Sequence, residues 1–168
     1  MKHYAILFQI VFLASAASGQ TELDRRNGFK DIKMVTPIDS IRGATFKKDI
    51  ESTESQFLKL YEIKHPAYSN IGDVPVDQVE VVTYKGLVYE ITVLTEKDPR
   101  LMRGMELALG RADFNVRDKT YSWGGKNLSL TFSPFGKDQI QLKYHSHLIT
   151  EMMKKDKEEK IEEIAEDF

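Results

Sequence analysis

Residues 78–94 read QVEVVTYKGLVYEITVL, and this stretch decides the fold class. Both halves of it are rich in β-branched and aromatic residues, which favour extended strands. Lys85 and Gly86 stand between the halves, and a glycine supplies the positive φ that a tight hairpin turn needs. The pattern therefore predicts two antiparallel strands joined by a short turn.

Further strands are expected on both sides of this hairpin, because apolar and polar residues alternate there. The predicted strands cover residues 56–63, 119–123, 127–132 and 139–146. Residues 47–55 are polar, and residues 64–74 contain proline and glycine, so both segments are predicted to be connections. The whole chain is expected to form an antiparallel sheet of about five to six strands.

Two short helices are expected, each starting at a capping residue followed by proline. The first begins at Thr36-Pro37 and ends at Gly43, and the second begins at Asp98-Pro99 and ends at Gly110. Leu101 of the second helix is expected to face the sheet. Because hairpin connections produce antiparallel sheets that helices cover on one face, the predicted class is α+β.

The C-terminal segment is predicted to be helical from about residue 147 onward. Over residues 154–163, nine of the ten side chains are charged, and oppositely charged residues four apart can pair on a helix. We therefore expect a single domain over residues 20–153, followed by a solvated, charged helical extension over residues 154–168. Residues 21–26 are polar and are expected to form a loose lead-in to the domain.

Residues 1–19 have the pattern of an export signal. A short basic start precedes an apolar run over residues 4–13 and small residues over 14–19. A run of about ten apolar residues is too short for a membrane-spanning helix, which takes about 20. We expect cleavage after Gly19, with Ala16 as the alternative. The mature protein is then expected to be periplasmic or secreted, without a transmembrane segment.

Composition narrows the chemistry that the protein can carry out. With 24 basic and 26 acidic residues the formal net charge is −2, which does not fit a nucleic-acid-binding domain. The sequence contains no cysteine, which excludes disulfides, thiolate nucleophiles, cysteine-ligated zinc and a lipid-modified cysteine. Secreted eukaryotic domains of this size commonly carry disulfides. The sequence therefore favours a protein of the bacterial envelope.

Short motifs along the chain resemble small exported domains of the β-lactamase-inhibitor-like and SmpA/OmlA-like type. The resemblance covers about residues 28–144, although Val35 stands where such domains often have a glycine. It implies a short helix before an antiparallel sheet and a non-enzymatic binding or assembly role, and it identifies no catalytic residue. The motifs are GFKDIK (28–33), TPIDSI (36–41), YKGLVY (84–89), LALGR (107–111) and YSW (121–123).

The histidines are the strongest candidates in the sequence for a metal or catalytic site. His145 and His147 are two apart, so on a strand they would share a face and could meet one ion. Tetrahedral zinc needs further ligands, and His65 is the only other histidine after the signal segment. No serine stands in a nucleophile elbow. We therefore predict no catalytic residue, no metal and no cofactor.

A protein partner in the cell envelope is the expected ligand. Trp123 and Tyr144 on predicted strands could form an aromatic platform for a ligand. Phe135 lies on a predicted turn, where a large aromatic side chain is hard to bury. Ile161, Ile164 and Phe168 form an apolar stripe on the last helix, which suits docking to a partner. The residues predicted to bind the partner are Trp123, Phe135, Tyr144, Ile161, Ile164 and Phe168.

Two other functions stay open from the sequence. One is a small hydrolase with an unrecognised site near His145 and His147, and the other is a carrier of a small apolar ligand between sheet and helices. A large pocket lined by perturbed acids would favour the hydrolase. A dry groove would favour the carrier, and a flat apolar patch would favour the interaction domain.

Overall fold

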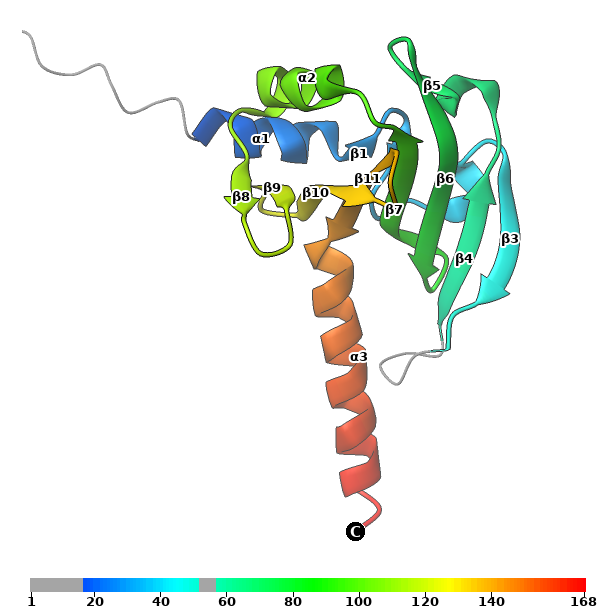
Figure 1. The fold of residues 1–168 in the computed structure, drawn as a ribbon. Helices are drawn as coiled ribbons and strands as arrows, with labels where there is room; N and C mark the ends of the chain where they lie inside the picture. Colours follow the sequence, from blue (N-terminus) through cyan, green and yellow to red (C-terminus); the bar gives the residue numbers. More distant parts are fainter. Residues whose placement is uncertain (1–16, 52–56) are drawn as a thin grey trace, which may run out of the picture.

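The computed structural model describes residues 17–51 and 57–168 and has an α+β fold (Figure 1). The elements are α1 (Ala17–Arg26), β1 (Gly28–Phe29), β2 (Ile32–Lys33), the 3-10 helix η1 (Ile38–Ser40), β3 (Ala44–Asp49), β4 (Leu58–Ile63), the 3-10 helix η2 (Pro66–Tyr68), β5 (Asn70–Ile71), β6 (Val74–Tyr84), β7 (Leu87–Glu96), α2 (Pro99–Leu109), β8 (Asp113–Asn115), β9 (Thr120–Gly124), β10 (Leu128–Phe135), β11 (Gln139–Ser146) and α3 (His147–Ala165). No helix in this described part is both long and apolar enough to span a membrane.

The main sheet is antiparallel and has nine strands, rather than the five to six expected. Its order is β3-β4-β6-β7-β11-β10-β9-β8, with the short β5 pairing to β6 outside this path. The chain thus builds one half of the sheet from β3 to β7 and the other half from β8 to β11. The halves meet where β7 pairs with β11, from Glu96 opposite Gln139 to Glu90 opposite His145.

The predicted hairpin is confirmed as β6 and β7, whose ends pair at Tyr84 and Leu87. The turn residue Lys85 has φ +49° and Gly86 has φ +80°, the left-handed conformation that a tight hairpin turn requires. The second predicted helix is confirmed as α2. Asp98 caps it by accepting a hydrogen bond from the backbone N–H of Arg100 at 2.7 Å.

Several predicted loops are strands in the structure. Within the segment 47–55, predicted to be a connection, residues 47–49 belong to β3, and residues 52–55 lie outside the described residues. The strand β8 was not predicted, and β10 extends to Phe135 instead of ending at residue 132. Both β3 and β8 lie at the edges of the sheet, where few side chains are buried and alternation is weak.

The first predicted helix is a single turn of 3-10 helix, and Thr36 does not cap it. Its hydroxyl donates instead to the carbonyl of Lys33 at 2.7 Å. The preceding residue, Val35, has φ +62°, which a β-branched residue rarely adopts and glycine adopts readily. The backbone at Val35 therefore has a conformation that glycine would adopt without steric cost.

The prediction that residues 21–26 form a loose lead-in is wrong, because these residues form the C-terminal part of α1. Leu23 is 1% exposed and belongs to the main core. The Asp24 carboxylate accepts hydrogen bonds from the backbone N–H groups of Lys126 at 2.7 Å and Asn127 at 2.9 Å. This link fixes α1 to the turn between β9 and β10. Of the predicted signal segment, residues 1–16 lie outside the described residues.

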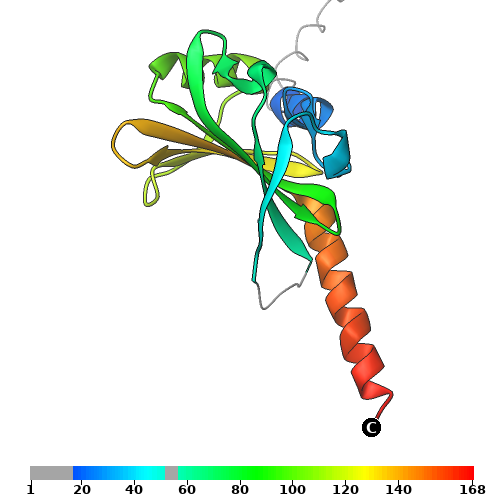
Figure 2. The same cartoon turned by 90° about the vertical axis from the view of Figure 1, so that its right-hand side faces the viewer.

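Two apolar clusters lie on the two faces of the sheet. The larger one joins the sheet to α1 and α2 through residues such as Leu23, Val81 and Leu101. The smaller one joins Leu58 and Tyr84 to the first turns of α3. Asp156 of the following turn still contacts Lys85 at the turn between β6 and β7, and the end of α3 extends beyond the sheet (Figure 2).

Candidate ligand-binding pocket

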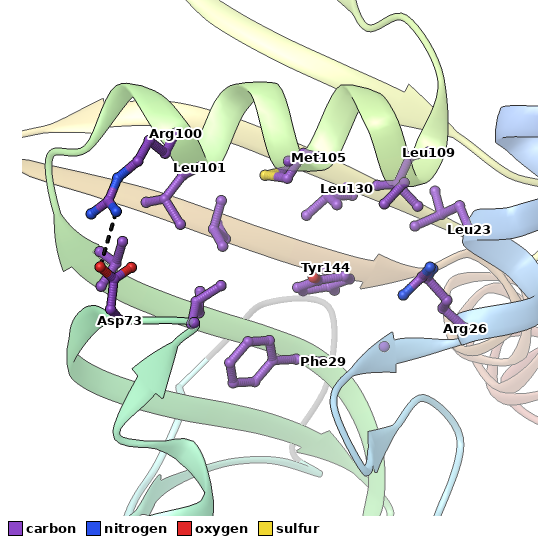
Figure 3. A pocket seen from close by; sticks show the side chains of 17 residues that line it. Leu23, Arg26, Phe29, Asp73, Arg100, Leu101, Met105, Leu109, Leu130 and Tyr144 are labelled. Carbon is purple, nitrogen blue, oxygen red and sulfur yellow. Dashed lines mark hydrogen bonds and ion pairs between the residues drawn. The ribbon is translucent and has the colours of Figure 1, made fainter.

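A pocket of about 380 Å³ lies between α2, the end of α1 and the face of the sheet that carries the larger core. We call it the α2 pocket. Figure 3 shows α2 forming one wall, with strand residues opposite it and the end of α1 at one side. The pocket is lined by Leu23, Arg26, Gly28, Phe29, Ile71, Gly72, Asp73, Val74, Arg100, Leu101, Gly104, Met105, Ala108, Leu109, Leu130, Leu142 and Tyr144.

The lining is mostly apolar because α2 presents one face to the pocket. Leu101, Met105 and Ala108 are spaced four and three apart, which places them on the same side of a helix. Both halves of the sheet complete the wall, with Ile71 and Val74 from the first half and residues of β10 and β11 from the second. The pocket therefore lies over the seam between the halves.

Gly104 keeps part of this helix face free of side chains. It lies on the same face as Leu101 and Ala108, and a Cβ at this position would meet no heavy atom within 4 Å. Glycine inside a helix costs roughly 0.5–1 kcal/mol of stability relative to alanine. Packing thus does not require glycine here, and its effect is to leave space at the pocket.

The two ends of the pocket differ in charge (Figure 3). At one end Arg100 pairs with Asp98 at 2.6 Å and with Asp73 at 2.9 Å, so one cation faces two carboxylates. The hydrogen bonds that Arg100 donates to Asp98 and Asp73 raise the pKa of Arg100 above its usual value. This end carries a net negative charge and no unpaired cation.

The opposite end is positive. Glu22 pairs with Arg25 at 2.6 Å and with Arg26 at 2.8 Å, so two cations share one carboxylate. The hydrogen bond from Arg25 and the charges of both arginines lower the pKa of Glu22 to about 2, so it stays ionised at neutral pH. Arg26 lines the pocket, whereas Arg25 does not.

The residues predicted to bind a partner lie at separate places in the structure. Trp123 is 3% exposed and donates from Nε1 to the Gly110 carbonyl at 2.8 Å, so a protein partner cannot reach it from solvent. Tyr144 is also buried, but it lines the α2 pocket. The remaining four are exposed: Phe135 at the end of β10, Ile161 and Ile164 on α3, and Phe168 after the end of α3.

The histidines form hydrogen bonds that have a structural role. His145 lies 3.0 Å from the Thr150 hydroxyl through Nε2 and 3.8 Å from Glu90 through Nδ1. The single hydroxyl hydrogen of Thr150 goes to the Ser146 carbonyl at 3.0 Å, so this hydroxyl accepts from His145 and is not activated by it. The arrangement of acid, histidine and hydroxyl therefore lacks an activated nucleophile.

His147 does not complete this group. It starts α3 instead of continuing the strand, and its Nδ1 lies 3.3 Å from the Lys126 carbonyl. The rings of the two histidines are 6.4 Å apart. Within residues 17–51 and 57–168, no group of three or more histidine or acidic side chains could hold a metal ion.

The chain was compared with protein-family models, curated proteins and solved structures. No protein-family model, no curated protein and no solved structure matches this chain.

Sequence reasoning missed the charged and open positions of the pocket. Arg26 and Tyr144 stand 118 positions apart, from 26 to 144, and belong to no common motif. Gly104 was the one available signal, since a glycine in the middle of an amphipathic helix lowers helix stability without an evident local reason.

Proposed function

We propose that this chain is a non-enzymatic binding module that holds a small, elongated, apolar ligand in the α2 pocket. The observation that carries the proposal is an open pocket of about 380 Å³ with mainly aliphatic and aromatic walls. Ligand pockets in proteins typically measure roughly 300–1,000 Å³ and combine apolar walls with a few polar groups. Gly104 supports the proposal, because a larger side chain there would take up the space at some gain in helix stability.

An uncharged fluorescent probe tests this function. N-phenylnaphthylamine brightens when it enters an apolar site, and we expect saturable binding to the purified protein. Gly104→Leu adds an aliphatic side chain to the pocket face of α2 and should weaken binding by about tenfold or more. Arg103→Leu adds a similar side chain at an exposed position of the same helix outside the lining, and serves as the control.

The two variants separate a pocket from a sticky surface. Binding that falls in Gly104→Leu and persists in Arg103→Leu supports the α2 pocket. Absence of saturable binding, or equal binding by all three proteins, contradicts the proposed function.

We place this module in the bacterial envelope, outside the cytoplasm. The export-signal pattern of residues 1–19 and the absence of cysteine support this location. The resemblance to small exported domains supports a binding or assembly role in the same compartment. Mass spectrometry of exported protein should find an N-terminus between Ala17 and Gln20, and an intact Met1 on exported material would contradict it.

We also propose a second role, protein binding through α3. The observation that favours it is that Ile161 and Ile164 are 57% and 60% exposed on a helix that projects from the domain (Figure 2). They are three apart and share one face, as in helices that dock into an apolar groove of a partner protein.

Site-specific crosslinking tests this second role in the native envelope. A benzoylphenylalanine at position 164 lies on the apolar face, and the same residue in place of Glu163 projects about 100° away from it around α3. We expect one defined protein product from position 164 only. Equal products from both positions, or none from either, would contradict docking of this face.

A further inference from the structure

Tyr144 lines the α2 pocket with an accessible hydroxyl. The residue is 9% exposed, and its hydroxyl forms no hydrogen bond within residues 17–51 and 57–168 but is not fully buried, so a molecule in the pocket can reach it. Burial raises the pKa of Tyr144 to about 12, so the phenol is protonated at neutral pH and can donate a hydrogen. A ligand atom that accepts a hydrogen bond can therefore pair with this hydroxyl.

Arg26 points into the same end of the pocket (Figure 3). Its Nε donates to Glu22 at 2.8 Å, and its Nη groups have no hydrogen-bond partner among the described residues. Glu22 is shared with Arg25, so it does not neutralise both cations. The charge of Arg26 acts on the Tyr144 phenol and lowers its pKa, opposing the effect of burial, which places the two groups in one electrostatic environment.

The rest of the pocket offers no second position for an anion. The Asp73–Arg100–Asp98 cluster at the far end has one more carboxylate than cations and would repel an anionic group. Between the two ends the lining is apolar, with Leu101, Met105 and Leu130 labelled in Figure 3.

We infer that the ligand is a single-chain amphiphile with a carboxylate head, held at Arg26 and Tyr144 with its chain along α2. The inference rests on the proposed function, since it names the class of ligand for the same pocket. A guanidinium binds a carboxylate through two parallel N–H groups, and the Tyr144 hydroxyl supplies a further donor. One arginine whose Nη groups are unpartnered among the described residues, together with one phenol, matches a singly charged head better than a phosphate, which needs more cationic partners.

The test compares ligands that share a chain and differ in the head. Decanoate, decanol and decyl phosphate are titrated by calorimetry against the unmodified protein and three variants. We expect decanoate to bind at least about tenfold more tightly than decanol. Arg26→Gln should abolish this preference, because it removes the charge that distinguishes the two heads.

Arg25→Gln is the matched control for net charge. Arg25 also pairs with Glu22, but its side chain is 69% exposed and it does not line the pocket. This variant should keep the preference for decanoate. Tyr144→Phe should weaken the binding of decanoate by several-fold, because the carboxylate loses a donor. Arg26 is half-exposed, so its replacement should leave the fold intact, and the melting temperature of each variant confirms this.

The outcomes separate the two proposals. Equal binding of decanoate and decanol, or a preference that survives Arg26→Gln, overturns the carboxylate inference and leaves the apolar pocket in place. Tighter binding of decyl phosphate than of decanoate also overturns the carboxylate assignment. Absence of binding by all three ligands overturns the proposed function itself.

Discussion

The Asp156 carboxylate of α3 lies 2.6 Å from the Lys85 ammonium group at the turn between β6 and β7. The same carboxylate accepts a hydrogen bond from the Tyr84 hydroxyl. Further along α3, the Lys160 ammonium lies 5.4 Å from the centre of the Phe57 ring. The charged part of α3 therefore contacts the hairpin that defines the fold, although we expected it to be a solvated extension.

Replacing Asp156 should release the end of α3 from the hairpin. The hydrogen bonds from Lys85 and Tyr84 lower the pKa of Asp156, which shows that they favour the charged carboxylate. In Asp156→Asn we expect several-fold faster amide hydrogen exchange over residues 154–165, with a nearly unchanged melting temperature. Glu163→Gln, which removes an exposed charge of the same helix, is the control. Unchanged exchange in Asp156→Asn would show that the contact does not order the helix.

The orientation of α2 can be tested with two leucines of that helix. Leu101 is 6% exposed and Leu107 is 90% exposed. Leu101→Ala should lower the free energy of unfolding by about 2–5 kcal/mol because it removes buried apolar volume. Leu107→Ala should change it by less than about 0.5 kcal/mol. Unfolding is followed by the fluorescence of Trp123, the single tryptophan, and similar effects of both changes would contradict the burial described.

Two buried threonines should respond oppositely to replacement by valine. Thr83 and Thr95 are both fully buried, but the Thr83 hydroxyl has no hydrogen-bond partner among the described residues. The Thr95 hydroxyl donates to the Glu96 carbonyl at 3.0 Å. Thr83→Val should stabilise the protein by about 1 kcal/mol, and Thr95→Val should destabilise it by about the same amount. Chemical denaturation measures both, and a loss of stability in Thr83→Val would point to a partner for its hydroxyl.

Glu90 should contribute stability that is lost in acid. Burial raises the pKa of Glu90, but the neighbouring His145, with Nδ1 3.8 Å from the carboxylate, and the Lys143 ammonium at 3.1 Å outweigh burial, so the pKa lies below its ordinary value of 4.5. A carboxyl whose pKa is lowered by folding stabilises the protein above the unfolded pKa and loses this effect as the pH falls through the folded pKa.

The pH dependence is measured against the variant Glu90→Gln. The unmodified protein should be more stable than the variant above about pH 5, and the two should converge as the pH falls below about 4. Glu106→Gln, on the exposed part of α2, is the control and should follow the unmodified protein. A stability difference that grows as the pH falls would contradict the direction of the Glu90 shift.

The elements that the sequence predicted correctly are those with strong local signals. The β6–β7 hairpin has β-branched arms and a turn with glycine, and α2 has a capping aspartate before a proline. The edge strands β3 and β8 escaped prediction because their side chains are mostly exposed and polar. Residues 21–26 look polar, yet Leu23 anchors α1 in the core, and the sequence pattern around Leu23 does not indicate this contact.

The α2 pocket could not be predicted, for a related reason. Its charged end comes from the last turn of α1, its hydroxyl from β11 and its open wall from α2. These positions meet only because β7 pairs with β11 and brings the two halves of the sheet together. The exposed residues on α3 were predicted from helical spacing, which is a local property, and their role in binding stays a prediction.

The pairing of β7 with β11 also has a consequence for how the chain folds. Each half of the sheet is a meander of neighbouring strands with low contact order, whereas β7 and β11 are separated by the whole segment of α2, β8, β9 and β10. Closing so long a loop is slow compared with forming a hairpin. We expect the two halves to form early and their joining to limit the rate, so that the α2 pocket comes into existence only in the final step of folding.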